Sequence, residues 1–220
     1  MLTEIWELLW KRWDFFGGLL LEHLETSAIA IVIAALLGLL IGVFISEYRG
    51  TAKIVMSLVN FIYTIPSISL LGFLIPMSGI GDTTAIIALV VYALLPMVRN
   101  THTGLTNVDP LLLEAATGMG STRFQLLWKI KLPLAAPVIV AGLRNMAVMT
   151  ISLAGIASFI GAGGLGVAIY RGITTNNKAM TIIGSLLIAL LAITVDILIG
   201  IIEKRISPNH KITKRKERLL

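Results

Sequence analysis

Few of the residue types that carry out chemistry occur in this chain of 220 residues, and they are scattered along it. The chain has no cysteine, and its three histidines, His23, His102 and His210, lack the spacing of metal ligands. No phosphate loop of the form Gly-x-x-x-x-Gly-Lys-Ser/Thr occurs, and neither a carboxylate pair nor a nucleophile beside a base can be identified. The sequence therefore predicts no catalytic residue, no metal site and no cofactor held by this chain.

One stretch does carry a recognisable pattern. Residues 114–133 read EAATGMGSTRFQLLWKIKLP and place three basic residues between two long apolar runs. Asp109 is a favourable N-cap and Pro110 suits the first helical position, so we expect a helix to begin there. Gly118 and Gly120 are expected to end it, because glycine readily adopts the left-handed conformation at a helix C-terminus.

A second helix is expected directly after these glycines, with Ser121 as its cap. It carries an apolar stripe at i, i+3 and i+4, made of Phe124, Leu127 and Trp128. Pro133 is expected to close the unit where the next apolar run begins. The stretch therefore predicts a helix–turn–helix at the membrane surface, in which the small Ala115 and Ala116 let another protein approach the backbone.

The spacing Glu-Ala-Ala, three residues, Gly, nine residues, Ile, one residue, Leu-Pro resembles the signature cytoplasmic loop of permease subunits in bacterial ABC importers. Its seven fixed positions are filled here by Glu114, Ala115, Ala116, Gly120, Ile130, Leu132 and Pro133. The resemblance implies that this loop, Gly118 included, docks into a groove on an ATP-hydrolysing subunit and transmits its closure to the membrane helices. The alternative is an amphipathic loop that only lies on the lipid headgroups.

Composition indicates an integral membrane protein. Mean hydropathy is +0.91, and 14% of the residues are charged, against about 25% in soluble domains. A chain of this length is expected to form one domain, with no room for a soluble enzyme fused to the spans. Because of where the basic residues lie, the net charge of +6 indicates membrane orientation rather than nucleic-acid binding.

Residues 1–26 are expected to form an interfacial segment. Its aromatic residues are Trp6, Trp10, Trp13, Phe15 and Phe16. They lie among five acidic and two basic residues, a mixture that suits a helix lying in the membrane interface. A secretory signal is not predicted, because the first long apolar run follows acidic residues and ends without a small-residue cleavage site.

Residues 27–203 are expected to form the transmembrane permease domain. Five runs are long and apolar enough to span a bilayer: Ser27–Ile45, Ile54–Ile75, Ile80–Val98, Leu134–Ile160 and Ala179–Ile202. With a cytoplasmic coupling loop over 99–133 and a basic tail over 204–220, thirteen basic residues fall on one side and four on the other. The positive-inside rule then predicts an outer N-terminus and a cytoplasmic C-terminus in a bacterial inner membrane.

The predicted fold class is therefore an all-α, multi-pass integral membrane protein. It has a five-helix transmembrane core, which the resemblance implies to be of the ABC importer permease type. An interfacial helix precedes this core, and the helix–turn–helix loop lies on its cytoplasmic side.

The second run is interrupted by polar residues and a proline: Asn60, Tyr63, Thr64, Pro66, Ser67 and Ser69. Such a stretch is tolerated inside a membrane only where protein or a water-filled cavity covers it, so we expect it to face the translocation path. The alternative is that the hydroxyl groups bond back to their own helix and that Pro66 only kinks it.

Residues 161–166 read GAGGLG, with glycines at Gly161, Gly163, Gly164 and Gly166. A phosphate-binding loop is a poor interpretation, because it needs a preceding strand, whereas this stretch follows a membrane helix on the outer face. We expect a tight turn or a close helix crossing at the outer mouth instead.

Two ionisable residues, Arg144 and Asp196, fall inside expected spans, and both lie in the cytoplasmic half of the membrane. A charge costs about 2.5–3.5 kcal/mol at the bilayer centre unless it is paired or hydrated, so these residues are candidates for an intramembrane ion pair. The alternative is that each side chain extends separately to the headgroups.

The resemblance extends over about residues 30–200. Further segments are similar to the quaternary-ammonium branch of these permeases, at residues 79–81, 92–96, 99–101, 118–120 and 161–166. That branch imports osmoprotectants such as glycine betaine, carnitine, choline and proline betaine. The resemblance implies a second permease subunit, identical or paralogous, two ABC ATPase subunits that bind the ATP, and an external substrate-binding protein, with no nucleic acid.

Three alternatives stay open. A permease for another small solute, such as methionine, shares the loop and a five-span core. A secondary transporter driven by an ion gradient would require inverted repeats and buried carboxylates at the midplane, and only Asp196 is available. A structural or assembly membrane protein would not need the Glu-Ala-Ala pattern.

Overall fold

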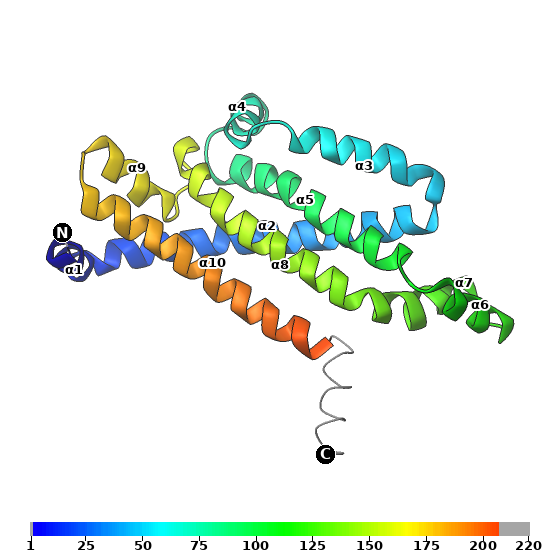
Figure 1. Cartoon of the computed structure of the whole chain (residues 1–220). Helices are drawn as coiled ribbons and strands as arrows, with labels where there is room; N and C mark the ends of the chain where they lie inside the picture. The colour runs from blue at the N-terminus through cyan, green and yellow to red at the C-terminus, as the bar shows by residue number, and fades with distance from the viewer. Residues whose placement is uncertain (1, 207–220) are drawn as a thin grey trace, which may run out of the picture.

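The computed structural model of the chain describes residues 2–206, and the regular elements in that part are all helical. Four long helices form the body of the molecule (Figure 1): α2 (Trp13–Glu47), α5 (Asp82–Thr106), α8 (Leu132–Ala157) and α10 (Lys178–Ile206). The shorter α-helices are α1 (Leu2–Lys11), α3 (Arg49–Tyr63), α4 (Ser67–Ser78), α6 (Pro110–Gly118), α7 (Arg123–Leu126) and α9 (Gly166–Thr174). A π-turn, η1 (Leu127–Lys131), and a 3-10 turn, η2 (Ser158–Ile160), flank α8. Most of the expected basic tail, residues 207–220, lies outside the described residues.

The number of apolar helices agrees with the expected five-span core, with one correction. Four helices of the described part are long and apolar enough to cross a membrane, and α3 with α4 makes a fifth span if the pair is taken together. These two helices meet at 96°, so the expected span Ile54–Ile75 is broken rather than kinked. The break falls before Pro66, because proline lacks an N–H donor and restricts the residue that precedes it.

Small residues set the distance between α2 and α5. Four of them recur every four positions on one buried face of α2: Ala30, Ala34, Gly38 and Gly42. A Cβ added to Gly38 would lie 2.6 Å from Met97 Cγ, and one added to Gly42 would lie 2.5 Å from Thr101 Cβ. This spacing of small residues brings the two backbones together, as is common between membrane helices.

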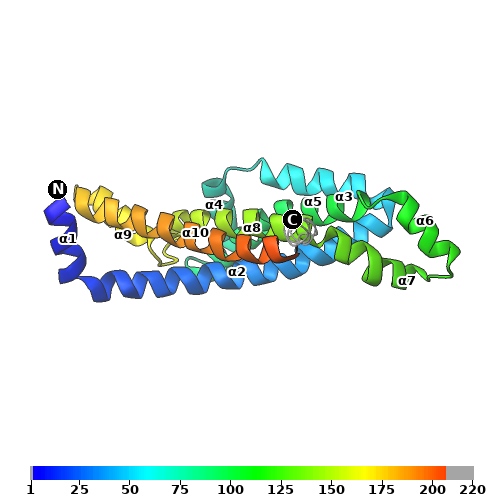
Figure 2. The ribbon, with the colours of Figure 1, turned by 60° about the horizontal axis from the view of Figure 1, so that its bottom comes forward.

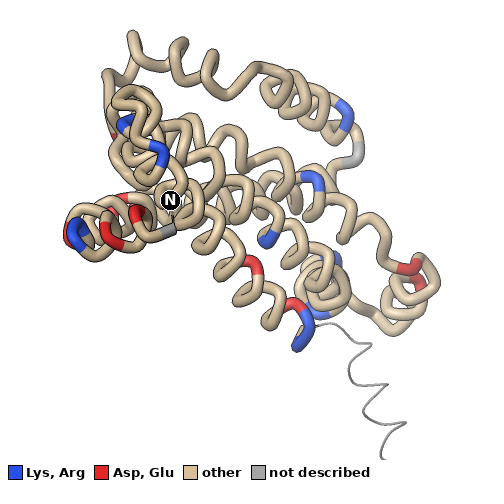
Figure 3. The backbone as a smooth tube through the Cα atoms, turned by 60° about the vertical axis from the view of Figure 1, so that its left-hand side comes forward, with Lys and Arg blue, Asp and Glu red and all other residues tan. Residues whose placement is uncertain are grey.

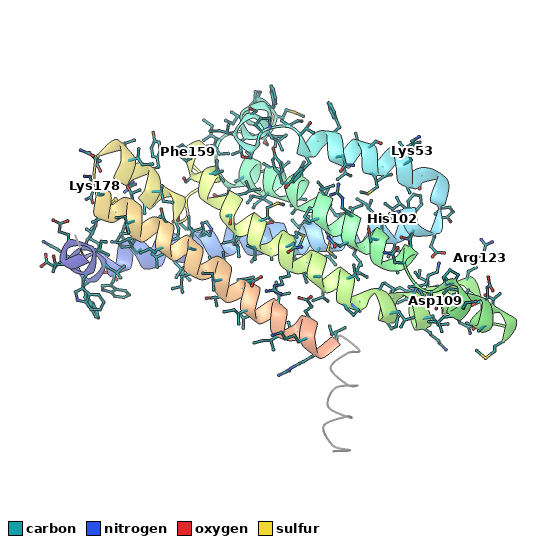
Figure 4. All side chains as sticks on the ribbon, in the orientation of Figure 1. Lys53, His102, Asp109, Arg123, Phe159 and Lys178 are labelled. Carbon is teal, nitrogen blue, oxygen red and sulfur yellow. The ribbon has the colours of Figure 1, made fainter. Side chains whose placement is uncertain are left out.

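The two ends of the helix bundle are built differently. α6 and α7 project from one end, whereas α1 and α9 lie at the other (Figure 2). Lys53, Asp109 and Arg123 are labelled at the first end, and Phe159 and Lys178 at the second (Figure 4). The loop after α5 therefore lies at the same end as Lys53, as the alternation of spans predicts. Between the two ends, long stretches of the chain carry no charged residue (Figure 3).

α2 is longer than the first expected span. It runs without a break from Trp13 through residue 26, where the interfacial segment is predicted to end, to Glu47. At 1.5 Å per residue its length is about 52 Å, which exceeds the roughly 30 Å of bilayer hydrocarbon. The separate N-terminal helix is α1, which turns away from α2 (Figure 2) and exposes Trp6 and Trp10. The interfacial position of residues 1–26 stays a prediction.

Candidate functional site

The first helix of the loop between α5 and α8 forms as expected. Asp109 Oδ1 accepts a 2.9 Å hydrogen bond from the N–H of Leu111, which confirms Asp109 as the N-cap of α6. Pro110 occupies the first helical position, where its missing N–H is not needed. The helix ends at Gly118, and Gly120 takes a φ of +86°, which favours glycine.

The second helix of the loop begins one residue later than expected, with Thr122 rather than Ser121 as its cap. Thr122 Oγ1 accepts from the N–H of Gln125 at 3.3 Å, and Gln125 Oε1 accepts from the N–H of Thr122 at 2.9 Å. Ser121 cannot form this reciprocal capping box, because the residue three positions after it is Phe124. The spacing Thr-x-x-Gln is the sequence signal that identifies the correct cap.

Pro133 does not close the unit, contrary to expectation. α7 continues through the π-turn Leu127–Lys131 into α8, so that residues 123–160 form one helical rod of 38 residues. A proline inside a helix lacks an N–H donor and crowds the carbonyl four residues earlier. The π-turn lies where this conflict arises and accommodates it. α7 is therefore continuous, through the π-turn, with a membrane helix.

The loop presents an open apolar surface. Met119 at its turn is 82% exposed, and Phe124 is 70% exposed. Of the motif residues, Glu114, Ala115, Gly120 and Pro133 are exposed, Ile130 and Leu132 are half-buried, and Ala116 is buried. A Cβ added to Gly118 or Gly120 would meet no atom within 4 Å. Apolar side chains beside unobstructed glycines leave this surface free to contact another protein.

Aromatic side chains from α3 and α5 support the break between α3 and α4. Tyr92 of α5 is buried, and its hydroxyl donates to the backbone carbonyl of Ile65 inside the break. The Tyr63 ring meets the Tyr92 ring edge to face, with centroids 5.8 Å apart, and the Tyr63 hydroxyl donates to Met149 Sδ at 3.4 Å. The break is thus a built feature that α5 and α8 hold in place.

The polar residues around this break differ in their surroundings. Asn60, Tyr63, Thr64 and Pro66 are exposed, whereas Ser67 and Ser69 are half-buried. Asn60 Oδ1 accepts a 2.7 Å hydrogen bond from Arg99 Nη2. The Thr64 hydroxyl instead donates back to the carbonyl of Phe61 at 2.6 Å, as the alternative interpretation expects. A place for this stretch in the translocation path stays a prediction.

The structure brings Arg144 and Asp196 together between α8 and α10. Arg144 Nε and Nη2 donate to the two carboxylate oxygens of Asp196 at 2.5 and 2.6 Å, which makes a bidentate pair. Arg144 Nη1 also donates to Glu203 Oε2 at 3.2 Å, a partner that was not predicted from the sequence. Glu203 follows Asp196 by seven residues, two helical turns along the same face, and this spacing is the available signal. Between 29% and 36% of each side chain stays accessible in the single chain.

The glycines that follow α8 turn tightly against the N-terminal part of α2. Gly161, Gly163 and Gly164 all have positive φ angles, between +66° and +79°. The N–H of Gly164 donates to Glu22 Oε2 at 2.9 Å, and a Cβ added to Gly163 would lie 2.6 Å from the same oxygen. The loop therefore needs glycine both for its backbone conformation and for its closeness to α2.

The same crossing includes a buried histidine, for which the sequence predicted no role. His23 is 1% exposed, and its Nε2 donates to the backbone carbonyl of Ile151 in α8 at 3.0 Å. A Cβ added to Gly164 would lie 3.0 Å from His23 Nδ1, and one added to Gly166 would lie 1.9 Å from the carbonyl oxygen of Gly155. These glycines let the loop, α2 and α8 meet at backbone distance.

Residues 19–208 match the family described as the binding-protein-dependent transport system inner membrane component. The chain is 41% identical to the carnitine transport permease protein OpuCD of Listeria monocytogenes, over 85% of this chain and 84% of that protein. It is 38% identical to the glycine betaine/carnitine/choline transport system permease protein OpuCD of Bacillus subtilis, over 94% and 93%. Its identity to the osmoprotectant import permease protein OsmW of Salmonella typhimurium is 40%, over 88% and 93%.

The fold is similar to that of a solved structure of the MetNI methionine ABC transporter in an inward-facing conformation. The TM-score is 0.81 at 24% identity, over 87% of this chain and 96% of that one. At this identity the likeness concerns the fold alone, and it confirms the ABC importer permease fold expected from the sequence. The chain, a multi-pass transport component rather than an enzyme, belongs to the family of binding-protein-dependent transport system inner membrane components.

Proposed function

We propose that this chain is the membrane-spanning subunit of an ATP-driven importer for osmoprotectants of the quaternary-ammonium class, such as glycine betaine, carnitine, choline and proline betaine. The observation that carries this substrate class is the 38–41% identity, over most of the chain, to permeases named for carnitine, glycine betaine, choline and osmoprotectants. The methionine transporter shares the fold at 24% identity, which makes a methionine permease the weaker candidate.

The proposed assembly contains a second permease subunit, two ATPase subunits that bind and hydrolyse the ATP, and an external substrate-binding protein. The exposed apolar loop supports an ATPase partner, because Met119 and Phe124 would otherwise stay in water. The excess of basic residues on the side of this loop supports a cytoplasmic position for it and an outer N-terminus.

The accessible charges of the Arg144 cluster support a neighbouring subunit or a water-filled space beside α8 and α10. A charge that faces hydrocarbon is costly, even when it is partly paired. Arg144, Asp196 and Glu203 carry a net negative charge and stay about one-third accessible in the single chain. In the assembled importer, protein or water is therefore expected to cover this side of the subunit.

The experiment is uptake in proteoliposomes by the chain reconstituted with its candidate ATPase and substrate-binding protein. Radiolabelled glycine betaine, carnitine or choline is expected to accumulate only with internal ATP and only with the loaded binding protein. Uptake is expected to persist when proton and sodium gradients are collapsed by ionophores while ATP is retained.

Two results would contradict this proposal. Uptake of methionine instead of the quaternary-ammonium compounds would change the substrate class and leave the ATP-driven mechanism in place. Loss of uptake under ionophores at an unchanged ATP level would favour a transporter driven by an ion gradient.

A further inference from the structure

The inner end of α2 is joined to the base of the coupling loop. Lys131 Nζ donates to Glu47 Oε1 at 2.6 Å, and the two residues lie 84 positions apart in the sequence. Glu47 is the last residue of α2, and Lys131 is the last residue of the π-turn that precedes α8. The ion pair therefore connects the first span to the joint where the loop becomes a membrane helix.

The outer part of α2 is joined to the other end of the same rod. His23 Nε2 donates to the carbonyl of Ile151 in α8, and Glu22 accepts from the N–H of Gly164 in the loop that follows η2. A backbone carbonyl can only accept a hydrogen bond, so Nε2 carries the proton. Glu22 and Glu47 are separated by 25 helical residues, about 37 Å along α2.

Buried packing fills the distance between these two attachments. One apolar cluster contains Ala30 and Ala34 of α2 together with Met146 and Ala154 of α8. Close-packed interiors resist continuous deformation, and so two helices joined at both ends and packed between them tend to move as one body.

The π-turn is the weak point of the rod that runs over residues 123–160. A π-turn departs from the regular ladder of helical hydrogen bonds and often occurs where a helix serves a function. Without a brace, a force on α7 could bend the chain at residues 127–131 instead of moving α8. The Glu47–Lys131 pair supplies such a brace, because it ties the last residue of this turn to α2.

We propose that α2 and the rod over residues 123–160 form one lever, whose outer end is the glycine loop at residues 161–166. Glu47 and Lys131 are positioning residues at its inner end, and Glu22 and His23 are positioning residues at its outer end. The lever carries the displacement of the coupling loop to the outer mouth of the translocation path. This proposal rests on the proposed function, because it assumes a partner that moves the coupling loop.

The first test measures solute taken up per ATP hydrolysed by the reconstituted complex. Lys131→Gln and Glu47→Gln each remove the ion pair and should lower this ratio about two- to fivefold, the range expected for a partly exposed pair, while ATP hydrolysis continues. The exchange Glu47→Lys with Lys131→Glu should restore much of the ratio. Lys53→Gln is the matched control, because Lys53 is an exposed basic residue near the same end (Figure 4). An unchanged ratio in both single variants would overturn the inner attachment.

The second test replaces the ion pair with a covalent link. This chain has no cysteine, so Glu47→Cys with Lys131→Cys gives it two thiols, its only ones, that a short bis-maleimide can join. The doubly substituted complex should show the lowered ratio, and cross-linking should raise it toward the wild-type value. If cross-linking abolishes uptake, the contact opens during each cycle and the lever is wrong.

The outer attachment has its own matched pair of variants. Glu22→Ala removes the acceptor for the N–H of Gly164 and should lower uptake per ATP, whereas Glu25→Ala removes an exposed carboxylate one turn further along α2 and should not. Equal ratios for the two variants would overturn the outer attachment.

Failure of the lever and failure of the proposed function can be told apart. Cross-linking at residues 47 and 131 can be measured on the purified chain without partners or transport. If residues 47 and 131 cross-link but the wild-type complex shows no ATP-driven uptake, the proposed function is rejected. The lever then has no transport movement to carry and is rejected with it. No cross-link in a complex that does transport would reject the lever alone.

Discussion

Two loops depend on glycine but use it in opposite ways: the predicted coupling loop between α5 and α8, and the glycine loop at residues 161–166, called the outer loop here because it is predicted to lie on the outer side. An added Cβ would meet nothing within 4 Å at Gly118 or Gly120 in the coupling loop. In the outer loop it would lie 2.6 Å from Glu22 Oε2 at Gly163 and 1.9 Å from the carbonyl oxygen of Gly155 at Gly166. The outer glycines make room for side-chain and backbone atoms of the chain itself, whereas the coupling-loop glycines leave room that the described chain does not fill. A glycine motif in a sequence therefore does not reveal whether the glycines make room for the chain itself or for a partner.

The largest expected loss of unfolding free energy is that caused by Gly166→Ala in the outer loop. The new methyl group would clash with a backbone carbonyl of α8, which cannot move aside as a flexible side chain can. Overpacking of a core usually costs about 1–3 kcal/mol, so we expect a loss of at least about 3 kcal/mol of unfolding free energy here. Thermal unfolding in detergent measures it. Gly17→Ala is the control, because Gly17 lies in α2 with nothing within 4 Å, and equal midpoints for the two variants would contradict the close crossing.

The Arg144 cluster joins α8 to α10 along the chain between the two loops, and its side chains stay about one-third accessible in the single chain. Arg144→Ala or Asp196→Ala leaves a charge without its bidentate partner, at a cost of about 2.5–3.5 kcal/mol by insertion scales. Glu203→Ala should cost less, because Glu203 makes one contact at 3.2 Å whereas Asp196 makes two shorter ones. Folded yield and thermal midpoint in detergent measure these losses.

The double substitution of Arg144 and Asp196 shows whether the two residues act together. It should lose less stability than the two single losses added, although couplings in membrane bundles average only about 0.6 kcal/mol. A thermal double-mutant cycle gives the coupling directly. Strictly additive losses would mean that the two side chains contribute separately despite their contact.

Substitutions in the coupling loop should have the opposite effect to those in the outer loop: transport should be lost while the stability of the chain is largely kept. Gly118→Asp places a charged side chain on an exposed surface that this chain leaves free, so the thermal midpoint should stay nearly unchanged. Gly120→Asp adds the cost of a side chain at a φ of +86°, about 1–2 kcal/mol. Both should uncouple ATP hydrolysis from uptake, which stimulation by loaded binding protein in proteoliposomes measures. Normal stimulation and uptake in both variants would remove the docking role from the loop.

The features that the sequence predicted well depend on local chemistry. Asp109 and Pro110 start a helix because an N-cap and a proline at the first position act within one turn, and Gly120 supplies the left-handed residue after it. The apolar runs predicted four uninterrupted spans because a bilayer sets the length that a helix needs. The 19–208 family match agrees with the loop pattern that suggested the permease fold.

The features that the sequence did not predict depend on contacts between distant segments. Pro133 was expected to stop a helix, but the π-turn before it lets the rod continue. The sequence predicted an interruption around Pro66, with a simple kink as the alternative, but it did not predict the contact of Tyr92 with Ile65 that supports a complete break. Glu47 and Lys131 lie too far apart in the sequence for any local pattern to join them.

The smallest expected effect on stability is the loss of the helix cap at Thr122, and substitution of the neighbouring Ser121 serves as its control. Thr122 caps α7 through its exchange of hydrogen bonds with Gln125, whereas Ser121 has no part in that cap. Loss of an N-cap typically costs about 1 kcal/mol. Because α7 lies in an exposed loop, Thr122→Ala should fray this helix locally and leave the thermal midpoint of the whole chain almost unchanged.

Hydrogen exchange at the amides of Gln125 and Leu126, which both donate to Thr122, measures this local loss. A cost of 1 kcal/mol corresponds to exchange about fivefold faster in Thr122→Ala, with Ser121→Ala close to the wild-type rate. If Ser121→Ala accelerates exchange as much as Thr122→Ala does, the cap is shared between the two hydroxyls. If Thr122→Ala also lowers the thermal midpoint by several degrees, the coupling loop is packed into the chain as firmly as the outer loop is. The contrast between a loop that fits its own chain and a loop left open for a partner would then fail.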